Sequence, residues 1–325
     1  MPISPQLSLP LRTFTDDPAF DWSRMLAAAR AMDDAGVDRV VVSDHVVFGA
    51  NSDAYADPSV GGVAGGRQPT GPDGQWLEPL TVLTALAATT TRIRLGTAIL
   101  LAALRRPVVL AKQLATLDVL SGGRIDLGVG VGWQREEYDA AGLPFERRGR
   151  LLDHTLEVCR ELWTERRATY RGPELSFDGI HQMPKPRQPG GIPVWVSGTV
   201  NDAVARRLTR FGTGWIPWGP ARDDPAGAIA AMKDRVASLG GDPGHLQIQG
   251  TATIVERPDG TLDIDATLAS VPPLIAAGVT DVRIPLLLPG DEPRAVDLLP
   301  DLVAAFRAAT DRPTPVLAAH GEPVE

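Results

Sequence analysis

TRIRLGTAILLAALRRPVVLAKQLATLDVLSGGRIDLGVGVGW, from Thr91 to Trp133, is the stretch that decides the fold. It opens with an apolar, partly β-branched run at Ile93–Leu100, continues as a helical pattern at Pro107–Leu120, and returns to an apolar run at Ile125. Proline suits the first position of a helix, and the glycines after Ser121 can adopt the positive φ that ends one. The stretch therefore predicts two parallel strands joined by a helix in a right-handed crossover.

Three glycines at alternate positions, Gly128, Gly130 and Gly132, end the second of these strands. Alternate residues share one face of a strand, so that face carries no side chains at its end. Two explanations stay open, close packing of a neighbouring helix and a floor for a flat cofactor. A dinucleotide-binding GxGxxG motif would need its third glycine at Trp133, and its glycines would lie in a turn, which argues against a Rossmann site.

Composition limits the class of protein. The chain has 325 residues, 43% of them hydrophobic, and a net charge of −8. This length supports a large α/β core, and the acidic balance argues against a nucleic-acid partner, which needs clustered Lys and Arg. Cys159 is the only cysteine, and its apolar helical context predicts a buried thiol in a reducing compartment. Neither a signal-peptide pattern nor a long apolar span is present, so we expect no membrane partner and a cytoplasmic location.

Strands and helices alternate along the whole chain, with two interruptions at residues 46–76 and 164–191. Eight alternations predict an α/β fold, a (β/α)8 TIM barrel with insertions after strands 2 and 4, whose active site lies at the carboxyl ends of the strands. We expect one domain at residues 1–310, with a mobile loop at 45–78 and a tail at 311–325. An open doubly wound sheet is the alternative, because alternation alone does not show closure. The predicted strands are Gln6–Leu11, Arg39–Ser43, Ile93–Leu100, Ile125–Val131, Pro193–Val196, Gly214–Pro217, Leu246–Val255 and Val282–Leu287, and the predicted helices are Asp21–Ala35, Pro79–Thr90, Pro107–Leu120, Arg147–Trp163, Asp202–Phe211, Pro225–Leu239, Ala266–Ala277 and Pro293–Ala309.

The segment Leu95–Tyr138 resembles the luciferase-like flavin and deazaflavin oxidoreductases, especially the branch that uses coenzyme F420. GVDRVVVSDHVV at Gly36–Val47 and IPVWVSGTVNDAVARRLTRFGTGWIPW at Ile192–Trp218 support the resemblance. It implies a luciferase-like barrel that transfers a hydride between F420 and a small organic substrate. The alternatives are a reduced-FMN monooxygenase that activates oxygen and a barrel that has lost catalysis. Relatives are commonly dimers, so we expect a homodimer.

Asp44 and His45 directly follow the second predicted strand. In a barrel His45 would lie at the catalytic rim, while Asp44 would point the other way. Taken alone, a histidine beside an aspartate at a strand end is more often structural. The resemblance implies instead that the two are catalytic, with His45 exchanging a proton with the substrate, a task that suits an imidazole near neutral pH.

The resemblance also implies where the cofactor binds. The third strand carries a bulge with a non-proline cis peptide in many relatives, expected here at Ala98–Ile99. The turn that starts at Ser197 lies between a strand and a helix, where backbone N–H groups can hold a phosphate. Arg105 and Arg106 follow the third strand within reach of an anionic cofactor tail. The expected cofactor-binding residues are Thr97, Ala98, Ile99, Gly130, Gly132, Ser197, Gly198 and Thr199.

Three tryptophans are the candidate substrate pocket. Trp133 and Trp218 fall at strand ends, and Trp76 closes the irregular loop, where aromatic walls could hold a flat ring and an apolar substrate. Core packing explains any one of them equally well. The five histidines show no metal-ligand spacing, and no HExxH, Walker A or GxSxG motif is present, so no metal is expected.

Two departures argue against sugar-phosphate oxidation, an activity found in this superfamily. Trp133 stands where the sugar-phosphate dehydrogenases carry an acid, and Gly49 stands where they carry a tryptophan. Glu136 and Glu137 are acids near the first of these positions, and a solvated helix face explains them equally well.

Overall fold

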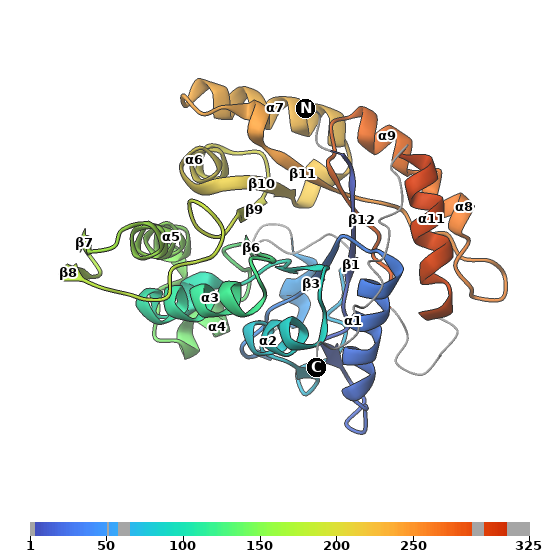
Figure 1. The fold of residues 1–325 in the computed structure, drawn as a ribbon, viewed down its shortest axis with the longest axis horizontal. Helices are drawn as coiled ribbons and strands as arrows, with labels where there is room; N and C mark the ends of the chain where they lie inside the picture. Colours follow the sequence, from blue (N-terminus) through green and yellow to red (C-terminus); the bar gives the residue numbers. More distant parts are fainter. Residues whose placement is uncertain (1–3, 51, 58–65, 288–295, 311–325) are drawn as a thin grey trace, which may run out of the picture.

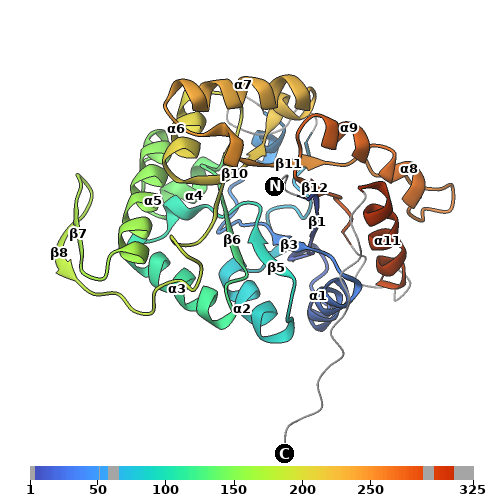
Figure 2. The ribbon, with the colours of Figure 1, turned by 45° about the horizontal axis from the view of Figure 1, so that its top comes forward.

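Eight parallel strands close into a barrel in the computed structural model, which describes residues 4–50, 52–57, 66–287 and 296–310. The closed order β1-β12-β11-β10-β9-β6-β5-β3 confirms the predicted barrel and excludes the open sheet. Figure 2 shows the strands in the middle and the helices around them. The barrel strands are β1 (Gln6–Pro10), β3 (Arg39–Val42), β5 (Arg94–Thr97), β6 (Ile125–Val129), β9 (Val194–Gly198), β10 (Gly212–Pro217), β11 (Gln247–Thr251) and β12 (Asp281–Arg283).

The outer helices follow the predicted apolar patterns. Helix α3 spans Pro107–Leu120 as predicted, with proline in its first turn, and Gly122 and Gly123 after it have φ of 73° and 87°. Helix α6 also has its predicted bounds, because Asn201 caps it by accepting a hydrogen bond from the Val204 N–H. The helices are α1 (Ser23–Ala35), α2 (Pro79–Thr89), α3, α4 (Arg135–Ala140), α5 (Arg148–Thr164), α6 (Asp202–Phe211), α7 (Pro225–Ser238), α8 (Ile264–Leu268), α9 (Val271–Ala276) and α11 (Leu299–Ala309).

The prediction fails most clearly near the C-terminus. The single helix predicted at Ala266–Ala277 is two short helices, α8 and α9, because Pro272 and Pro273 have no N–H to continue the first one and instead begin the second. The last strand, predicted at Val282–Leu287, is only β12. Of the last predicted helix, residues 296–297 are helical and α11 begins at Leu299, whereas residues 293–295 and the predicted tail lie outside the described residues.

Both interruptions contain regular structure that the sequence pattern did not predict. The segment 164–191 forms an antiparallel hairpin of β7 (Ala168–Arg171) and β8 (Ser176–Ile180), which extends from the edge of the molecule beside α5 (Figure 1). In the first interruption, β4 (Gln75–Trp76) pairs with β2 (Phe14–Thr15). These strands are too short to show an alternating pattern.

The glycine run packs against the chain that continues β5. A Cβ atom on Gly128 would lie 1.9 Å from the Thr97 carbonyl oxygen, and one on Gly130 would lie 2.9 Å from Ile99 Cδ1. At Gly132 the same position is 2.8 Å from Leu101 Cδ2. The bare face therefore admits a neighbouring strand, where the sequence had suggested a helix or a cofactor.

Replacing Gly128 by Ala is expected to destabilise the barrel by more than about 3 kcal/mol, since neither backbone can move without breaking the β5–β6 ladder. The Thr97 hydroxyl also donates to the Gly128 carbonyl at 2.7 Å. Gly142→Ala is the control, because φ is +70° there but nothing lies within 4 Å of the added Cβ. Its cost should stay near 1 kcal/mol, the cost of the backbone conformation alone. Equal urea midpoints for the two variants would contradict the packing argument.

A buried ionic layer fills the barrel below its mouth. Arg39 Nε donates to Asp126 at 2.8 Å, and Arg39 also pairs with Asp281. The Ser8 hydroxyl and the Gln249 amide donate to the Asp281 carboxylate at 2.8 and 3.2 Å. Burial opposes the charge of Arg39, but the two carboxylates outweigh it and raise its pKa. The layer therefore fills this part of the barrel interior with paired charges.

Candidate active site

His45 lies just beyond β3, at the carboxyl end of the barrel, against a carboxylate from α4. Its Nδ1 is 3.3 Å from Glu137 Oε1, and the Val46 N–H donates to the same oxygen at 2.8 Å. The side chains are 11% and 1% exposed, so the contact is nearly removed from water. A carboxylate there holds the imidazole with its proton on Nδ1 and leaves Nε2 for a substrate.

Glu137 is a candidate functional residue that the sequence did not single out. The solvated-face explanation is wrong for it, because its side chain is buried and its Oε2 has no hydrogen-bond partner. Gln134 on the same face of α4 is also buried, and it bonds the Gly49 N–H and the Val47 carbonyl at 3.1 and 2.6 Å. The spacing of Gln134, Glu137 and Tyr138, three and four residues apart, was the available signal, since these positions share one helical face.

Aromatic rings surround His45. The rings of Phe48, Trp76 and Trp133 have centroids 4.6, 4.7 and 6.0 Å from the imidazole. Tyr55 stands edge-on to Trp133 at 5.3 Å. Two of the three predicted pocket tryptophans thus meet at the histidine and form an apolar wall that limits water around it.

Trp218, the third predicted pocket residue, belongs to another part of the mouth. It follows β10, its N–H donates to the Gly198 carbonyl at 3.2 Å, and Arg222 lies 5.9 Å from its ring centroid. These contacts place Trp218 at the end of β9.

Asp44 points away from His45, as expected, and its partners are structural. Its carboxylate accepts two hydrogen bonds from Arg105, at 2.6 and 3.1 Å, and one from the Leu101 N–H at 2.8 Å. Arg105 also donates to Glu78, the cap of α2, at 2.8 Å. Burial opposes the charge of Arg105, but both carboxylates outweigh it and raise its pKa. Arg105 is therefore already paired with two carboxylates, and Arg106 is exposed.

The predicted cis peptide between Ala98 and Ile99 is confirmed. The Ala98 N–H donates to the Val42 carbonyl at 2.8 Å, and the Leu100 N–H donates to the Gly128 carbonyl at 2.7 Å. These bonds fix the peptide between β3 and β6. Val42, which accepts the first of them, lies three residues before His45. Ala98 and Ile99 are partly exposed, while their neighbour Thr97 is buried.

The turn Ser197-Gly198-Thr199 lies where β9 passes into α6. Asn201, which sequence analysis did not single out, donates from Nδ2 to Thr199 Oγ1 at 3.0 Å while it caps the helix. The Gly198 carbonyl accepts from Trp215 Nε1 at 3.0 Å. The turn is thus fixed from both sides at the N-terminal end of a ten-residue helix. The three residues are half-buried at the mouth of the barrel.

A family model described as luciferase-like monooxygenase matches residues 6–259, which include every element of this site. The chain belongs to the luciferase-like monooxygenase family. Named members of this family are oxidoreductases that act with a flavin or with F420. A protein of Mycobacterium tuberculosis, 36% identical over 221 residues, covers 66% of this chain with 74% of its own length, and it is itself uncharacterized.

Other proteins that are similar to this chain include F420-dependent enzymes and a monooxygenase. An F420-dependent glucose-6-phosphate dehydrogenase of Segniliparus rotundus is 34% identical over 189 residues, which are 56% of this chain and 48% of that protein. Among solved structures, an F420-dependent secondary alcohol dehydrogenase has a TM-score of 0.73 at 16% identity and covers 94% of this chain and 99% of its own. A monooxygenase of Streptomyces bottropensis has a TM-score of 0.71 at 21% identity, with 92% and 99% covered. At these identities the two structures show the shared fold alone.

Other chemistries find no support in this luciferase-like chain. Cys159 is buried in α5, and burial raises the pKa of its thiol, which disfavours the reactive thiolate. Within residues 4–310, apart from the gaps given above, no three His, Cys, Asp or Glu side chains gather closely enough to hold a metal. None of the described helices is long and apolar enough to cross a membrane.

Proposed function

We propose that this chain is an F420-dependent oxidoreductase that transfers a hydride between the deazaflavin and a small organic substrate. The observation that carries the proposal is the placement of His45, which is held by a buried carboxylate and walled by aromatic rings, three residues after the Val42 carbonyl that accepts from the Ala98 N–H. A histidine held in one tautomer near neutral pH is suited to supply or remove the proton that accompanies hydride transfer.

The mouth of the barrel fits a flat, anionic cofactor. Ala98 and Ile99 offer a partly exposed peptide surface at the end of β5, on which the ring would lie. The turn Ser197-Gly198-Thr199 would hold a cofactor phosphate with its backbone N–H groups and the N-terminal end of α6. Gly130 and Gly132 act indirectly, since they receive the side chains that position the cis peptide. Bound F420 would supply the hydride chemistry.

This chain's own residues would manage the proton. Glu137 Oε1 accepts from His45 Nδ1, so His45 Nε2 is the atom that exchanges a proton with the substrate. Phe48, Trp76 and Trp133 exclude water around the imidazole and shape an apolar space for the substrate. Asp44 contributes by fixing the strand end from which His45 projects, not by contact with the reacting atoms.

A reduced-FMN monooxygenase is the second candidate, favoured by the family match and by the neighbouring monooxygenase fold. The proposed ring-binding surface suits both rings, because its contacts come from backbone and small residues. A barrel without catalysis is the third candidate.

Titration of the purified protein with F420 and with FMN, each oxidised and reduced, tests the proposal. We expect F420 to bind at micromolar concentration or better and to raise the melting temperature, since a ligand that binds only the folded state stabilises it. The measurements are ring fluorescence and thermal unfolding, with Asn201→Ala as the variant whose loosened turn should weaken binding. Binding of FMN alone, with oxygen consumption coupled to substrate, would establish the monooxygenase. Failure of every ring to bind would leave the non-catalytic barrel.

A further inference from the structure

Three arginines at the open end of the barrel lack an anionic partner among the residues that the structure describes. Arg12 follows β1, Arg222 ends the 3-10 turn after β10, and Arg283 ends β12. No ion pair and no side-chain hydrogen bond of these three is found in the part of the chain that the structure describes. The Nε atoms of Arg12 and Arg283 are buried without a hydrogen-bond partner. By contrast, Arg39 and Arg105, which are also largely buried, are both fully paired with carboxylates.

Arg283 faces the barrel interior, one layer above the ionic layer. Alternate residues of a strand share a face, and Asp281 meets Ser8 and Arg39 inside the barrel, so Arg283 lies on the same inner face. Asp281 cannot neutralise it, because its oxygens are already bonded to Arg39, Ser8 and Gln249. Arg283 therefore places an uncompensated charge in a partly desolvated site.

The electrostatic environment of Arg283 is unfavourable for a cation. Burial, together with the nearby positive charge of Arg222, lowers the pKa of Arg283 to about 10. A buried charge without a partner costs free energy that a fold ordinarily avoids. A bound anion would remove this cost, and a guanidinium group is a good match for a carboxylate or a phosphate.

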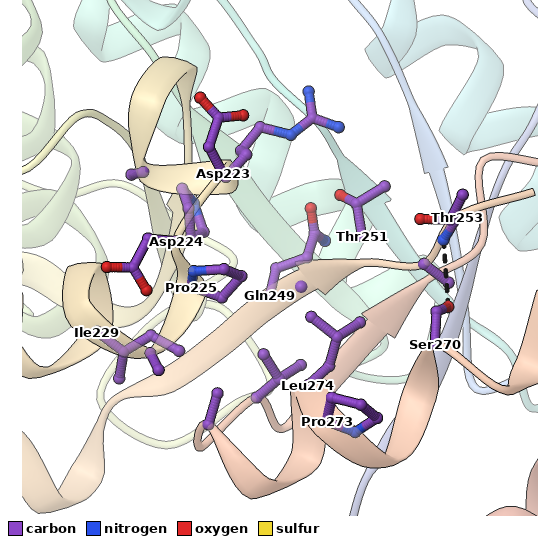
Figure 3. A pocket seen from close by; sticks show the side chains of 18 of the residues that line it. Asp223, Asp224, Pro225, Ile229, Gln249, Thr251, Thr253, Ser270, Pro273 and Leu274 are labelled. Carbon is purple, nitrogen blue, oxygen red and sulfur yellow. Dashed lines mark hydrogen bonds between the residues drawn. The ribbon is translucent and has the colours of Figure 1, made fainter.

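Arg222 and the sheet neighbour of Arg283 line a cavity of about 880 Å³. Thr251 is the residue paired with Arg283 across the β11–β12 ladder. Figure 3 shows Gln249 and Thr251 on one side of the cavity and Pro273 and Leu274 on the opposite side. Ile229 of α7 and Val279 extend the apolar part. The cavity thus joins a polar end, lined by Arg222, Thr251, Asp223 and Asp224, to an apolar end between α7 and α9.

Arg283 lies near the aromatic residues that approach the proposed catalytic histidine. The charge of Arg283 acts on the Tyr55 hydroxyl, and Tyr55 packs edge-on against Trp133, whose ring is 6.0 Å from His45. The cofactor phosphate has its own expected place at Ser197–Thr199, on β9. An anion at the arginines would therefore lie near the reacting centre and apart from the cofactor phosphate turn.

We infer that Arg222 and Arg283 form an anion subsite for the substrate, which is an organic acid with a carboxylate or phosphate at the arginines and an apolar body in the cavity between α7 and α9. The statement that the anion belongs to a substrate rests on the proposed function, but the anion subsite itself is independent of it.

Binding of octanoate, octanamide and inorganic phosphate to the purified protein tests the subsite directly by calorimetry and thermal shift. We expect octanoate to bind the wild type at least about tenfold more tightly than the uncharged octanamide, and phosphate to stabilise it. Arg283→Met and Arg222→Met should each lose about tenfold or more in octanoate affinity. Arg206→Met, at an exposed position on α6, is the matched control and should bind as the wild type does.

The melting temperature without ligand is a second readout. Arg283→Met should melt at or above the wild-type temperature, because the variant removes an unpaired buried charge. A lower melting temperature together with unchanged octanoate binding would assign Arg283 a structural role and overturn the subsite. Equal binding of octanoate and octanamide would also overturn it, since the cavity would then select only for apolar bulk.

Cofactor titration of the same variants shows whether the anion at the arginines belongs to the substrate or to the cofactor. Unchanged F420 and FMN affinity in Arg283→Met supports a substrate subsite. A tenfold loss there, with competition between octanoate and cofactor, would assign the arginines to the cofactor phosphate and overturn the substrate assignment. Failure of the wild type to bind either cofactor would refute the proposed function while leaving the octanoate result intact.

Discussion

The His45→Ala variant is expected to lose about 100- to 10,000-fold in kcat, the range that a positioned acid or base contributes. Its affinity for the cofactor should stay within a few-fold of wild type, because the expected cofactor contacts come from the cis peptide and the β9 turn. Steady-state turnover and fluorescence titration of the cofactor check both statements. Unchanged turnover would remove His45 from the mechanism.

Two further variants show whether the loss is specific. His245→Ala is the matched control, because His245 is 86% exposed and remote from the barrel mouth, and we expect no change in turnover. Glu137→Gln keeps the shape of the side chain but removes the charge that holds His45 Nδ1. It should lower kcat with little change in substrate KM, since the imidazole is then held in a mixture of tautomers. A fall in stability without a fall in kcat would make Glu137 a purely structural residue.

The fold was predictable because its signals are local. Pro107 and the glycines after Ser121 fix the bounds of α3 by backbone chemistry alone, and the structure has the same bounds. Closure of the barrel was inferred from the number of alternations, and each strand needs only its own apolar run to be recognised. The prediction failed where the local pattern misleads, as at Pro272 and Pro273, which divide one apolar pattern into two helices.

The site was less predictable because its contacts are distant in sequence. The ring of His45 meets Glu137, 92 residues away, and only the fold brings them together. His45 itself follows a strand and could be found, whereas Glu137 lies in a charged run whose buried face shows only through helical spacing. No sequence motif marks Arg222 and Arg283. They stand out because they lack an anionic partner among the described residues. Such an absence is visible only when the neighbours are known.

Replacing Asp44 by Ala is expected to lower the free energy of unfolding by about 3 kcal/mol, since it leaves Arg105 buried beside a single, half-exposed carboxylate. The Leu101 N–H, which donates to Asp44 at 2.8 Å, also loses its acceptor in a buried position. Urea unfolding of the apoprotein measures the effect without involving the cofactor. This outcome would assign Asp44 to the support of His45 rather than to the chemistry.

A double variant that also replaces Arg105, the ion-pair partner of Asp44, provides the decisive comparison. In the Asp44→Ala, Arg105→Met double variant the unpaired cation is gone, so much of the lost stability should return, because a buried ion pair contributes little over an apolar pair of similar shape. Asp178→Ala, which breaks the exposed pair with Arg171, should change stability by less than about 0.5 kcal/mol. If the double variant were no more stable than Asp44→Ala, the cost would come from the Leu101 N–H and not from the charge. If Asp44→Ala kept full stability but lost turnover, Asp44 would act on the reaction itself, and the separation of roles between Asp44 and Glu137 would be wrong.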